Sequence, residues 1–132
     1  MWATLRLTLA ALDASAARRA AAEALVDRCI ECGFCEPLCP SHRLTLSPRQ
    51  RIVSWRELSR REAAHEDPGQ VATDFAYFGL DTCAGCGLCS TACPVGIDTG
   101  ELTRLLRGRG MGSGSRKVAQ WTADNFGTVA SL

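Results

Sequence analysis

The eight cysteines of this 132-residue chain form two copies of one pattern, which constrains the fold more than any other feature of the sequence. In each copy two residues separate each of the first three cysteines from the next, three residues precede the fourth, and a proline follows it. The copies begin at Cys29 and Cys83, 54 residues apart, and a glycine after the second cysteine matches as well. No cysteine lies outside the copies. The fold must therefore place two similar, thiol-rich loops where each can bind a metal centre.

The spacing within each copy suits iron–sulfur chemistry. A 4Fe–4S cluster is held by four thiolates, and three closely spaced cysteines can supply three of them from one loop. In proteins with two clusters, the fourth cysteine of such a run ligates the other cluster. We therefore predict two 4Fe–4S clusters, the first bound by Cys29, Cys32, Cys35 and Cys93. The second is predicted to be bound by Cys83, Cys86, Cys89 and Cys39.

Two glycines and two prolines within the copies have predicted roles beside the ligands. Gly33 and Gly87 would let the backbone approach the clusters and present N–H groups to their sulfurs, so we predict both as cofactor-binding residues. Pro40 and Pro94 end each run without adding a backbone donor.

Structural zinc is the main alternative, because paired C-x-x-C motifs also form tetrahedral zinc sites. A zinc site takes its four ligands as two pairs, so the third cysteine of each copy would be left over, which favours iron–sulfur. A Rieske centre needs two histidine ligands, and His42 and His65 lack a matching spacing. We predict both histidines to be surface or satisfied residues. The sequence shows no nucleophile–base pair, phosphate-binding glycine loop or paired-carboxylate site, so we predict no catalytic residue.

Composition and charge exclude several other classes of protein. The chain is 46% hydrophobic and 22% charged, as in a globular protein, and its net charge of +1 predicts no nucleic-acid partner. No apolar run reaches the roughly 20 residues of a membrane span, so no transmembrane segment is predicted. Residues 1–12 resemble a weak signal peptide, but metal ligation needs reduced thiols. We therefore expect a cytoplasmic protein, at most peripheral to the inner membrane through a complex.

Helix-forming sequence surrounds both copies and alternating strand patterns are nearly absent, so the predicted fold class is mostly α. Ser47, Pro48 and Gln50 form a helix start with a capping box, and Asp98 is predicted to cap another helix. The predicted helices span residues 14–28, 47–66, 71–80, 98–108 and 116–129. We divide the chain into a helical lead-in (1–24), a domain with two 4Fe–4S sites (25–109), a flexible linker (110–115) and a C-terminal amphipathic helix (116–132).

Two further groups of side chains are notable. One stretch holds six arginines with only Glu57 opposing them: Arg43, Arg49, Arg51, Arg56, Arg60 and Arg61. They form either a solvated basic face or a docking face for an acidic redox partner or a flavin domain. Four aromatic residues are predicted to pack in the core around the clusters: Trp55, Phe75, Tyr77 and Phe78.

The long helical segment between Cys39 and Cys83 resembles the α-helical ferredoxin domain of fumarate reductase, glycolate oxidase and anaerobic glycerol-3-phosphate dehydrogenase. A closer resemblance is to the C-terminal iron–sulfur region of FAD-linked D-2-hydroxy acid dehydrogenases, of the D-lactate and D-2-hydroxyglutarate type. It covers about residues 25–130 and is carried by the stretches 26–37, 46–52, 81–83, 93–100 and 121–126. The stretch 46–52 (Leu-Ser-Pro-Arg-Gln-Arg-Ile) distinguishes this family from other helical ferredoxins.

The resemblance implies an electron-transfer module that relays electrons from reduced flavin to a downstream acceptor. Such enzymes bind FAD in a domain before the iron–sulfur region, and residues 1–24 are too few for one, so the chain resembles a fragment, a separately encoded subunit or a truncated reading frame. We expect FAD on a separate domain or partner, and no catalysis without that flavin domain. The alternatives are a ferredoxin-like carrier or an iron–sulfur subunit of another helical-ferredoxin oxidoreductase, and a zinc-stabilised interaction module.

Overall fold

The computed structural model describes residues 16–108 and 112–131. Within these ranges the chain is helical and has no β-strand, which confirms the predicted fold class. A first helix covers residues 16–27, and the others are α2 (Pro48–Ala63), α3 (Gly69–Asp74), η1 (Phe75–Asp81), α4 (Leu88–Thr91), α5 (Thr99–Arg107), α6 (Ser113–Asp124) and α7 (Phe126–Val129). The signal-like stretch, much of the lead-in and part of the predicted linker fall on residues 1–15 and 109–111, outside the described residues.

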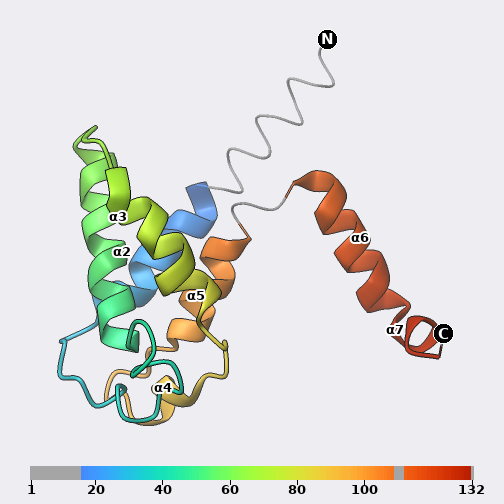
Figure 1. The fold of residues 1–132 in the computed structure, drawn as a ribbon, viewed down its shortest axis with the longest axis horizontal. Helices are drawn as coiled ribbons and strands as arrows, with labels where there is room; N and C mark the ends of the chain where they lie inside the picture. Colours follow the sequence, from blue (N-terminus) through green and yellow to red (C-terminus); the bar gives the residue numbers. More distant parts are fainter. Residues whose placement is uncertain (1–15, 109–111, 132) are drawn as a thin grey trace.

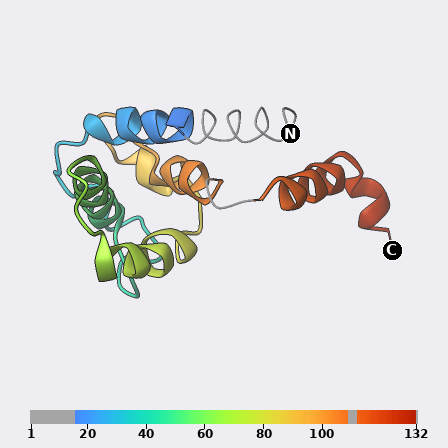
Figure 2. The same ribbon diagram turned by 90° about the horizontal axis from the view of Figure 1, so that it is seen from above.

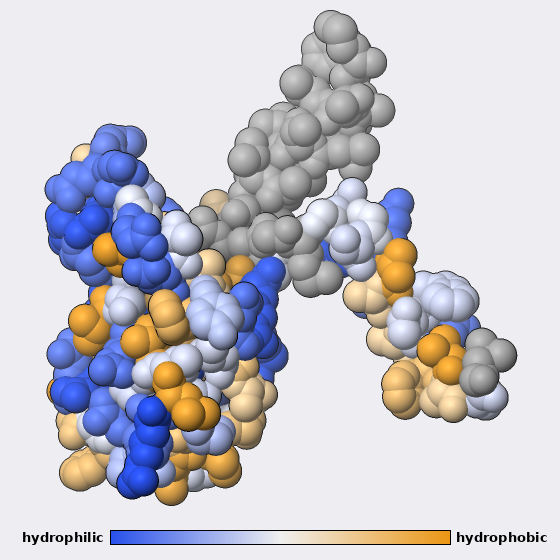
Figure 3. All heavy atoms as spheres, in the orientation of Figure 1, coloured by the Kyte–Doolittle hydropathy of each residue, from blue (hydrophilic) through white to orange (hydrophobic). Residues whose placement is uncertain are grey.

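The first helix, α2, α3, η1 and α5 gather into one body, and both cysteine loops lie at the same end of it (Figure 1). Seen from above, α6 and α7 lie away from this body (Figure 2). On the face drawn in Figure 3, hydrophilic residues cover the end of α2 far from the cysteine loops, and hydrophobic residues are more frequent toward the loops. The large apolar side chains exposed on the loops include Ile30, Phe34, Leu38 and Leu88.

Helix α2 begins where the sequence predicts it. The Ser47 side chain accepts a hydrogen bond from the backbone N–H of Gln50, and the Gln50 side chain accepts one from the N–H of Ser47. This reciprocal capping box satisfies donors that the first turn of a helix leaves free. The buried positions of α2 recur at helical spacing along one face: Pro48, Arg51, Ile52, Trp55 and Leu58.

Helix α2 ends at Ala63, three residues before its predicted end at Glu66. His65 has a φ of +55°, in the left-handed region that a continuing helix cannot contain. The Asp67 carboxylate then accepts a hydrogen bond from the backbone N–H of Gly69 at 2.9 Å. The chain therefore turns sharply between α2 and α3.

The predicted helix over residues 71–80 is present, but its second half is the π-helix η1. A Cβ atom at Gly79 would lie 2.4 Å from the ring of Phe75, so only glycine allows this close packing. Phe75 and Trp55 are buried, with ring centroids 6.3 Å apart, which confirms their predicted core positions. The prediction is wrong for Tyr77 and Phe78, which are exposed because they lie on the side of η1 opposite Phe75 and Gly79.

Helix α5 begins at its predicted cap, since the Asp98 carboxylate accepts a hydrogen bond from the N–H of Gly100 at 2.7 Å. It ends before Gly108, as predicted. The buried core comprises Ala22, Val26, Ile52, Trp55, Leu58, Phe75, Ile97, Leu102 and Leu106, and Val71 and Ala72 of α3 pack against it while partly buried. Cys29 and Cys93 pack against its edge, so the cysteine loops rest directly on the core.

Helix α6 begins at Ser113, three residues before its predicted start, because the extended Gly112 acts as the N-cap and the small residues after it adopt helical geometry. The predicted single helix is interrupted at Asn125, whose side-chain amide donates to the Trp121 carbonyl at 2.8 Å. Helix α7 then runs to Val129. None of the helices in the described ranges is long and apolar enough to cross a membrane.

Candidate metal centres

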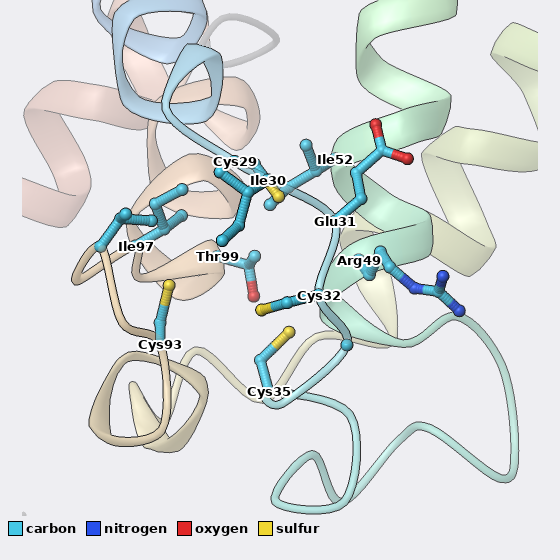
Figure 4. Close-up of a pocket in the computed structure, with 12 residues that line it drawn as sticks. Cys29, Ile30, Glu31, Cys32, Cys35, Arg49, Ile52, Cys93, Ile97 and Thr99 are labelled. Carbon is cyan, nitrogen blue, oxygen red and sulfur yellow. The ribbon is translucent and has the colours of Figure 1, made fainter.

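The structure groups the eight cysteines around two cavities. The first cavity is lined by Cys29, Cys32, Cys35 and Cys93. Figure 4 shows the sulfur atoms of these four residues directed toward one common space. The second cavity is lined by Cys39, Cys83, Cys86 and Cys89. Each cavity thus takes three cysteines from one copy of the pattern and the fourth from the other.

Cys39 lies at the second cavity because the chain after it is tied to the residue before Cys83. The Ser41 hydroxyl donates to the Thr82 carbonyl at 2.7 Å. The hydroxyls of Thr45 and Thr82 lie 2.8 Å apart. These two hydrogen bonds connect the end of the first cysteine run to the start of the second.

The loop after Cys93 links the two cavities. The N–H of Gly96 donates to the Cys93 carbonyl at 3.0 Å, and the turn carries Ile97 into the lining of the first cavity. Thr99, at the start of α5, lines both cavities. Its N–H donates to the Cys89 sulfur at 3.3 Å, and its hydroxyl lies 3.2 Å from the same sulfur. Thr99 therefore stands between the two groups of cysteines.

The backbone conformation of the two loops also repeats. Gly33 and Gly87 have φ values of +83° and +74°, which glycine adopts without steric cost. Two residues earlier, Glu31 (φ +58°) and Gly85 (φ +62°) are left-handed at equivalent positions. Left-handed residues in such turns direct successive backbone N–H groups into concave anion-binding surfaces. The sequence predicted roles for Gly33 and Gly87 but not for Glu31. A glycine at the equivalent position of the second loop, Gly85, was the available sign that this position is left-handed.

One arginine holds the start of each cysteine loop, and the hydrogen bonds that it makes are equivalent in the two loops. Arg56 of α2 donates to the carbonyls of Val26 (2.8 Å), Asp27 (3.3 Å) and Cys29 (3.1 Å). Arg107 of α5 donates to the carbonyls of Leu80, Asp81 (3.2 Å) and Cys83 (2.9 Å). These acceptors lie at helix C-termini, where carbonyls lack intrahelical partners and favour a cation. Both arginines lie nine residues after the cap of their helix, so the internal repeat extends into α2 and α5.

The charged side chains that line the first cavity are paired. Arg49 donates to the Glu36 carboxylate at 2.9 Å, and this bond and a second from Ser47 lower the pKa of Glu36. Glu31 accepts a hydrogen bond from Arg56 at 2.8 Å. The first cavity is therefore bordered by ion pairs that carry no net charge.

The remaining arginines of the basic stretch are neutralised in the same way. Arg60 and Arg61 both pair with Glu57, which lowers the pKa of Glu57 to about 2, and Arg60 also pairs with Glu66. Of the six arginines, Arg43 alone is both exposed and outside the ion pairs of the described residues. Glu57 is the only carboxylate within the stretch, as the sequence shows, but Glu31, Glu36 and Glu66 from other segments pair with these arginines as well. A basic docking face consequently has no support in the charge distribution.

The donor chemistry of both cavities fits iron–sulfur clusters. Four thiolates around one zinc ion would lie about 2.3 Å from it and leave no space between them. Here four cysteines line each cavity, yet within residues 16–108 and 112–131 no three His, Cys, Asp or Glu side chains converge on a single metal ion. Neither histidine lines a cavity, in agreement with the prediction that both are surface or satisfied residues. The Nδ1 atom of His42 lies 2.6 Å from the Cys39 carbonyl oxygen, and His65 is exposed.

The two groups of cysteines are close enough to interact electrostatically. The pKa of the Cys35 thiol is raised to about 11, first by burial and then by repulsion from Cys89 of the second cavity and from Cys93 and Cys29. A metal ion replaces the proton of a thiol that it binds, so this pKa describes the metal-free state. Cys32 and Cys86 are exposed, so each group also has an edge at the protein surface.

Comparison with known proteins identifies the family. Residues 25–97, which include all eight cysteines, match the 4Fe–4S dicluster domain. One subunit of the dihydromethanophenazine:CoB–CoM heterodisulfide reductase of Methanosarcina barkeri is 31% identical over 94 residues, covering 62% of this chain and 23% of that protein. The probable glycolate oxidase iron–sulfur subunit of Bacillus subtilis is 32% identical over 85 residues (60% of this chain, 17% of that protein). The glycolate oxidase iron–sulfur subunit of Escherichia coli is 31% identical over 85 residues (61% and 19%).

These comparisons also set limits. The chain spans less than a quarter of the length of the relatives named, and no solved structure matches it significantly. The family match confirms the predicted 4Fe–4S cofactor, and the relatives are subunits of oxidoreductases. Because the match covers more than half of its residues, the chain belongs to the 4Fe–4S dicluster domain family.

Proposed function

We propose that this chain is an electron-transfer module that binds two 4Fe–4S clusters and relays electrons from a reduced flavin, held by a partner subunit or domain, to a downstream acceptor. The ligands of the first cluster are Cys29, Cys32, Cys35 and Cys93. The ligands of the second are Cys39, Cys83, Cys86 and Cys89. The bound clusters supply the one-electron chemistry, and the protein sets their position and environment.

The arrangement of the two cavities carries this proposal. Each is lined by three cysteines of one run and the fourth of the other, which is the exchange expected of two-cluster proteins. The exposed Cys32 and Cys86 give each cluster an edge that a redox partner can approach. The Thr99 N–H donates to the Cys89 sulfur and its hydroxyl lies 3.2 Å from the same sulfur, while the left-handed Gly33 and Gly87 would let backbone N–H groups approach the clusters, and such donors stabilise negatively charged sulfur.

A 2-hydroxy acid is the proposed substrate of the flavin partner. Two relatives are named as glycolate oxidase subunits, and glycolate is a 2-hydroxy acid. The stretch 46–52 resembles FAD-linked D-2-hydroxy acid dehydrogenases, which makes D-lactate or D-2-hydroxyglutarate the more specific proposal. Oxidation of the hydroxy acid to a 2-oxo acid delivers two electrons to the flavin, which passes them on singly. The free thiols required for cluster binding favour a reducing compartment such as the cytoplasm.

Metal analysis and two ligand variants test the cluster assignment. Protein reconstituted anaerobically should contain about eight iron and eight labile sulfide per chain. Cys39→Ser should alter the electron paramagnetic resonance signal of the second cluster, and Cys93→Ser that of the first. About four iron, stoichiometric zinc, or a Cys39→Ser variant that alters only the first cluster would contradict the assignment.

Reduction by a flavin partner tests the proposed relay. With a matching flavoprotein present, addition of D-lactate or D-2-hydroxyglutarate should bleach the broad visible band of the clusters, as followed by stopped-flow absorbance. The 132 residues alone should bind no FAD and oxidise no hydroxy acid. Flavin binding or turnover by the chain alone, or clusters that stay oxidised beside a fully reduced flavin, would exclude this relay.

The heterodisulfide reductase relatives support a second candidate, an iron–sulfur subunit of a complex that reduces a disulfide. The same two clusters would then donate to a disulfide rather than accept from a hydroxy-acid flavoprotein. Reoxidation of the reduced clusters by a disulfide, together with no response to a reduced flavin partner, would favour this candidate.

A further inference from the structure

Arg51 places a buried positive charge beside the second group of cysteines. It is 1% exposed and lines the second cavity together with Cys39 and the Cys83 loop. One terminal nitrogen lies 3.6 Å from the Cys39 sulfur. No carboxylate in residues 16–108 and 112–131 lies within ion-pair distance of the guanidinium.

The other partners of Arg51 are neutral. Its Nε donates to the Gly79 carbonyl at 2.8 Å, and its second terminal nitrogen lies 3.4 Å from the Thr82 hydroxyl. The Gly79 carbonyl is available because it lies in the last turn of η1, where intrahelical donors run out. Neutral acceptors orient the guanidinium without balancing its charge, and an unbalanced buried charge is strongly unfavourable. A negatively charged group in the adjoining cavity would provide the balance.

A four-thiolate iron–sulfur cluster is such a group. Its net charge is negative and becomes more negative by one unit when it accepts an electron. A fixed cation nearby stabilises the reduced form more than the oxidised form and so raises the reduction potential. The Asp98 carboxylate also lies at this site, with one oxygen 3.6 Å from the Cys89 sulfur. It is paired with Arg104 at 3.1 Å, so this ion pair carries no net charge and Arg51 is the unbalanced charge of the site.

The first cavity lacks an equivalent charge. The internal repeat relates α2 to α5, with Ser47 matching Asp98 and Arg56 matching Arg107. In this alignment the position of Arg51 is taken by Leu102, which is also 1% exposed. The two halves therefore build similar sites that differ in the buried charge of Arg51. The other charged difference, Asp98 in place of Ser47, is paired with Arg104.

We propose that Arg51 raises the reduction potential of the second cluster above that of the first, so that a single electron entering the protein comes to rest on the second cluster. This inference depends on the ligand assignment of the proposed function. It adds an order of potentials, and hence a direction of internal electron transfer from the first site to the second.

Potentiometric titration of the fully loaded protein, followed by electron paramagnetic resonance, tests the inference. Each cluster gains one electron from a mediator-coupled reductant, and its signal is assigned with Cys39→Ser and Cys93→Ser. In Arg51→Gln the equilibrium constant for reducing the second cluster should fall at least tenfold, a potential lower by about 59 mV or more. The first cluster should shift much less. Arg51→Lys keeps the charge and should restore most of the potential. Arg43→Gln, which removes an exposed arginine, should change neither cluster.

Every outcome bears on the inference. If Arg51→Gln holds only about four iron while Arg51→Lys holds about eight, the second cluster requires the charge, which supports the inference. Unchanged potentials in Arg51→Gln, equal shifts of both clusters, or equal shifts in Arg51→Gln and Arg51→Lys would overturn it. Loss of the second cluster from both Arg51→Gln and Arg51→Lys would also overturn it, because cluster binding would then depend on the shape of the arginine side chain and not on its charge. Fewer than about eight iron in the unmodified protein would instead refute the proposed function.

Discussion

Replacing Arg56 with methionine tests how the first cysteine loop is held. Methionine keeps much of the apolar stem and removes the donors to the Val26 carbonyl (2.8 Å) and the Cys29 carbonyl (3.1 Å). It also removes the longer contact with Asp27 and the exposed ion pair with Glu31, which contribute little. A hydrogen bond from a charged donor contributes about 1.5–3 kcal/mol. Because the Arg56 side chain is 31% exposed, water can replace part of each bond. We therefore expect the two bonds together to contribute about 2 kcal/mol, below the sum of two fully buried bonds.

Thermal unfolding of the cluster-loaded protein, followed anaerobically by far-ultraviolet circular dichroism at one scan rate, measures this effect. A loss of about 2 kcal/mol should lower the Tm of a helical body of this size by about 10 °C. Arg60→Met is the matched control, since Arg60 lies on the same helix, is 54% exposed and pairs only with surface carboxylates. Surface ion pairs contribute little, so the Tm of Arg60→Met should stay close to that of the unmodified protein. Equal decreases in the two variants would refute the reasoning.

Glycine substitutions and cluster removal test other parts of the fold. Gly79→Ala should destabilise the protein by about 1–3 kcal/mol, because the new Cβ would lie 2.4 Å from the Phe75 ring, and a Tm equal to that of the unmodified protein would contradict this. Gly114→Ala, with open space around the new Cβ, should instead increase helical circular dichroism without lowering the Tm. Gly87→Ala should cost about 1–2 kcal/mol through left-handed strain and reduce the iron bound at the second site, as measured by metal analysis. Removing both clusters by chelation and oxidation should make thermal unfolding less cooperative, and an apoprotein that melts as sharply as the loaded protein would show that the helices pack without metal.

The features that sequence predicted correctly depend on neighbouring residues. The capping box of Ser47 and Gln50 and the cap at Asp98 involve groups within three residues, so local chemistry determines them. The cysteine spacing predicted the cofactor class, which the family match confirms, because cluster geometry restricts how thiolates can be spaced. The ligand sets of the two clusters stay a prediction, as do the roles of Gly33 and Gly87.

The features that sequence did not predict depend on contacts between distant segments. The basic stretch was read against carboxylates nearby in sequence, whereas Arg49 and Arg56 pair with Glu36 and Glu31 from the first cysteine loop. Arg51 was counted with the surface arginines, although the face of α2 that turns inward carries it into the second cavity. The π-helix η1 is a local exception, because the helix-forming pattern of residues 71–80 does not distinguish π from α geometry.

Each cavity takes cysteines from both runs, and this affects whether the two halves of the helical body separate when the chain between them is cut. If the clusters are ligated as proposed, two clusters join the half before the turn at residues 64–68 to the half after it. Each cluster takes three ligands from one half and the fourth from the other. A protease that cuts this turn would then leave a nicked protein whose fragments migrate together in a native gel. The two fragments would separate only after both clusters are removed, because one remaining cluster is enough to hold them together.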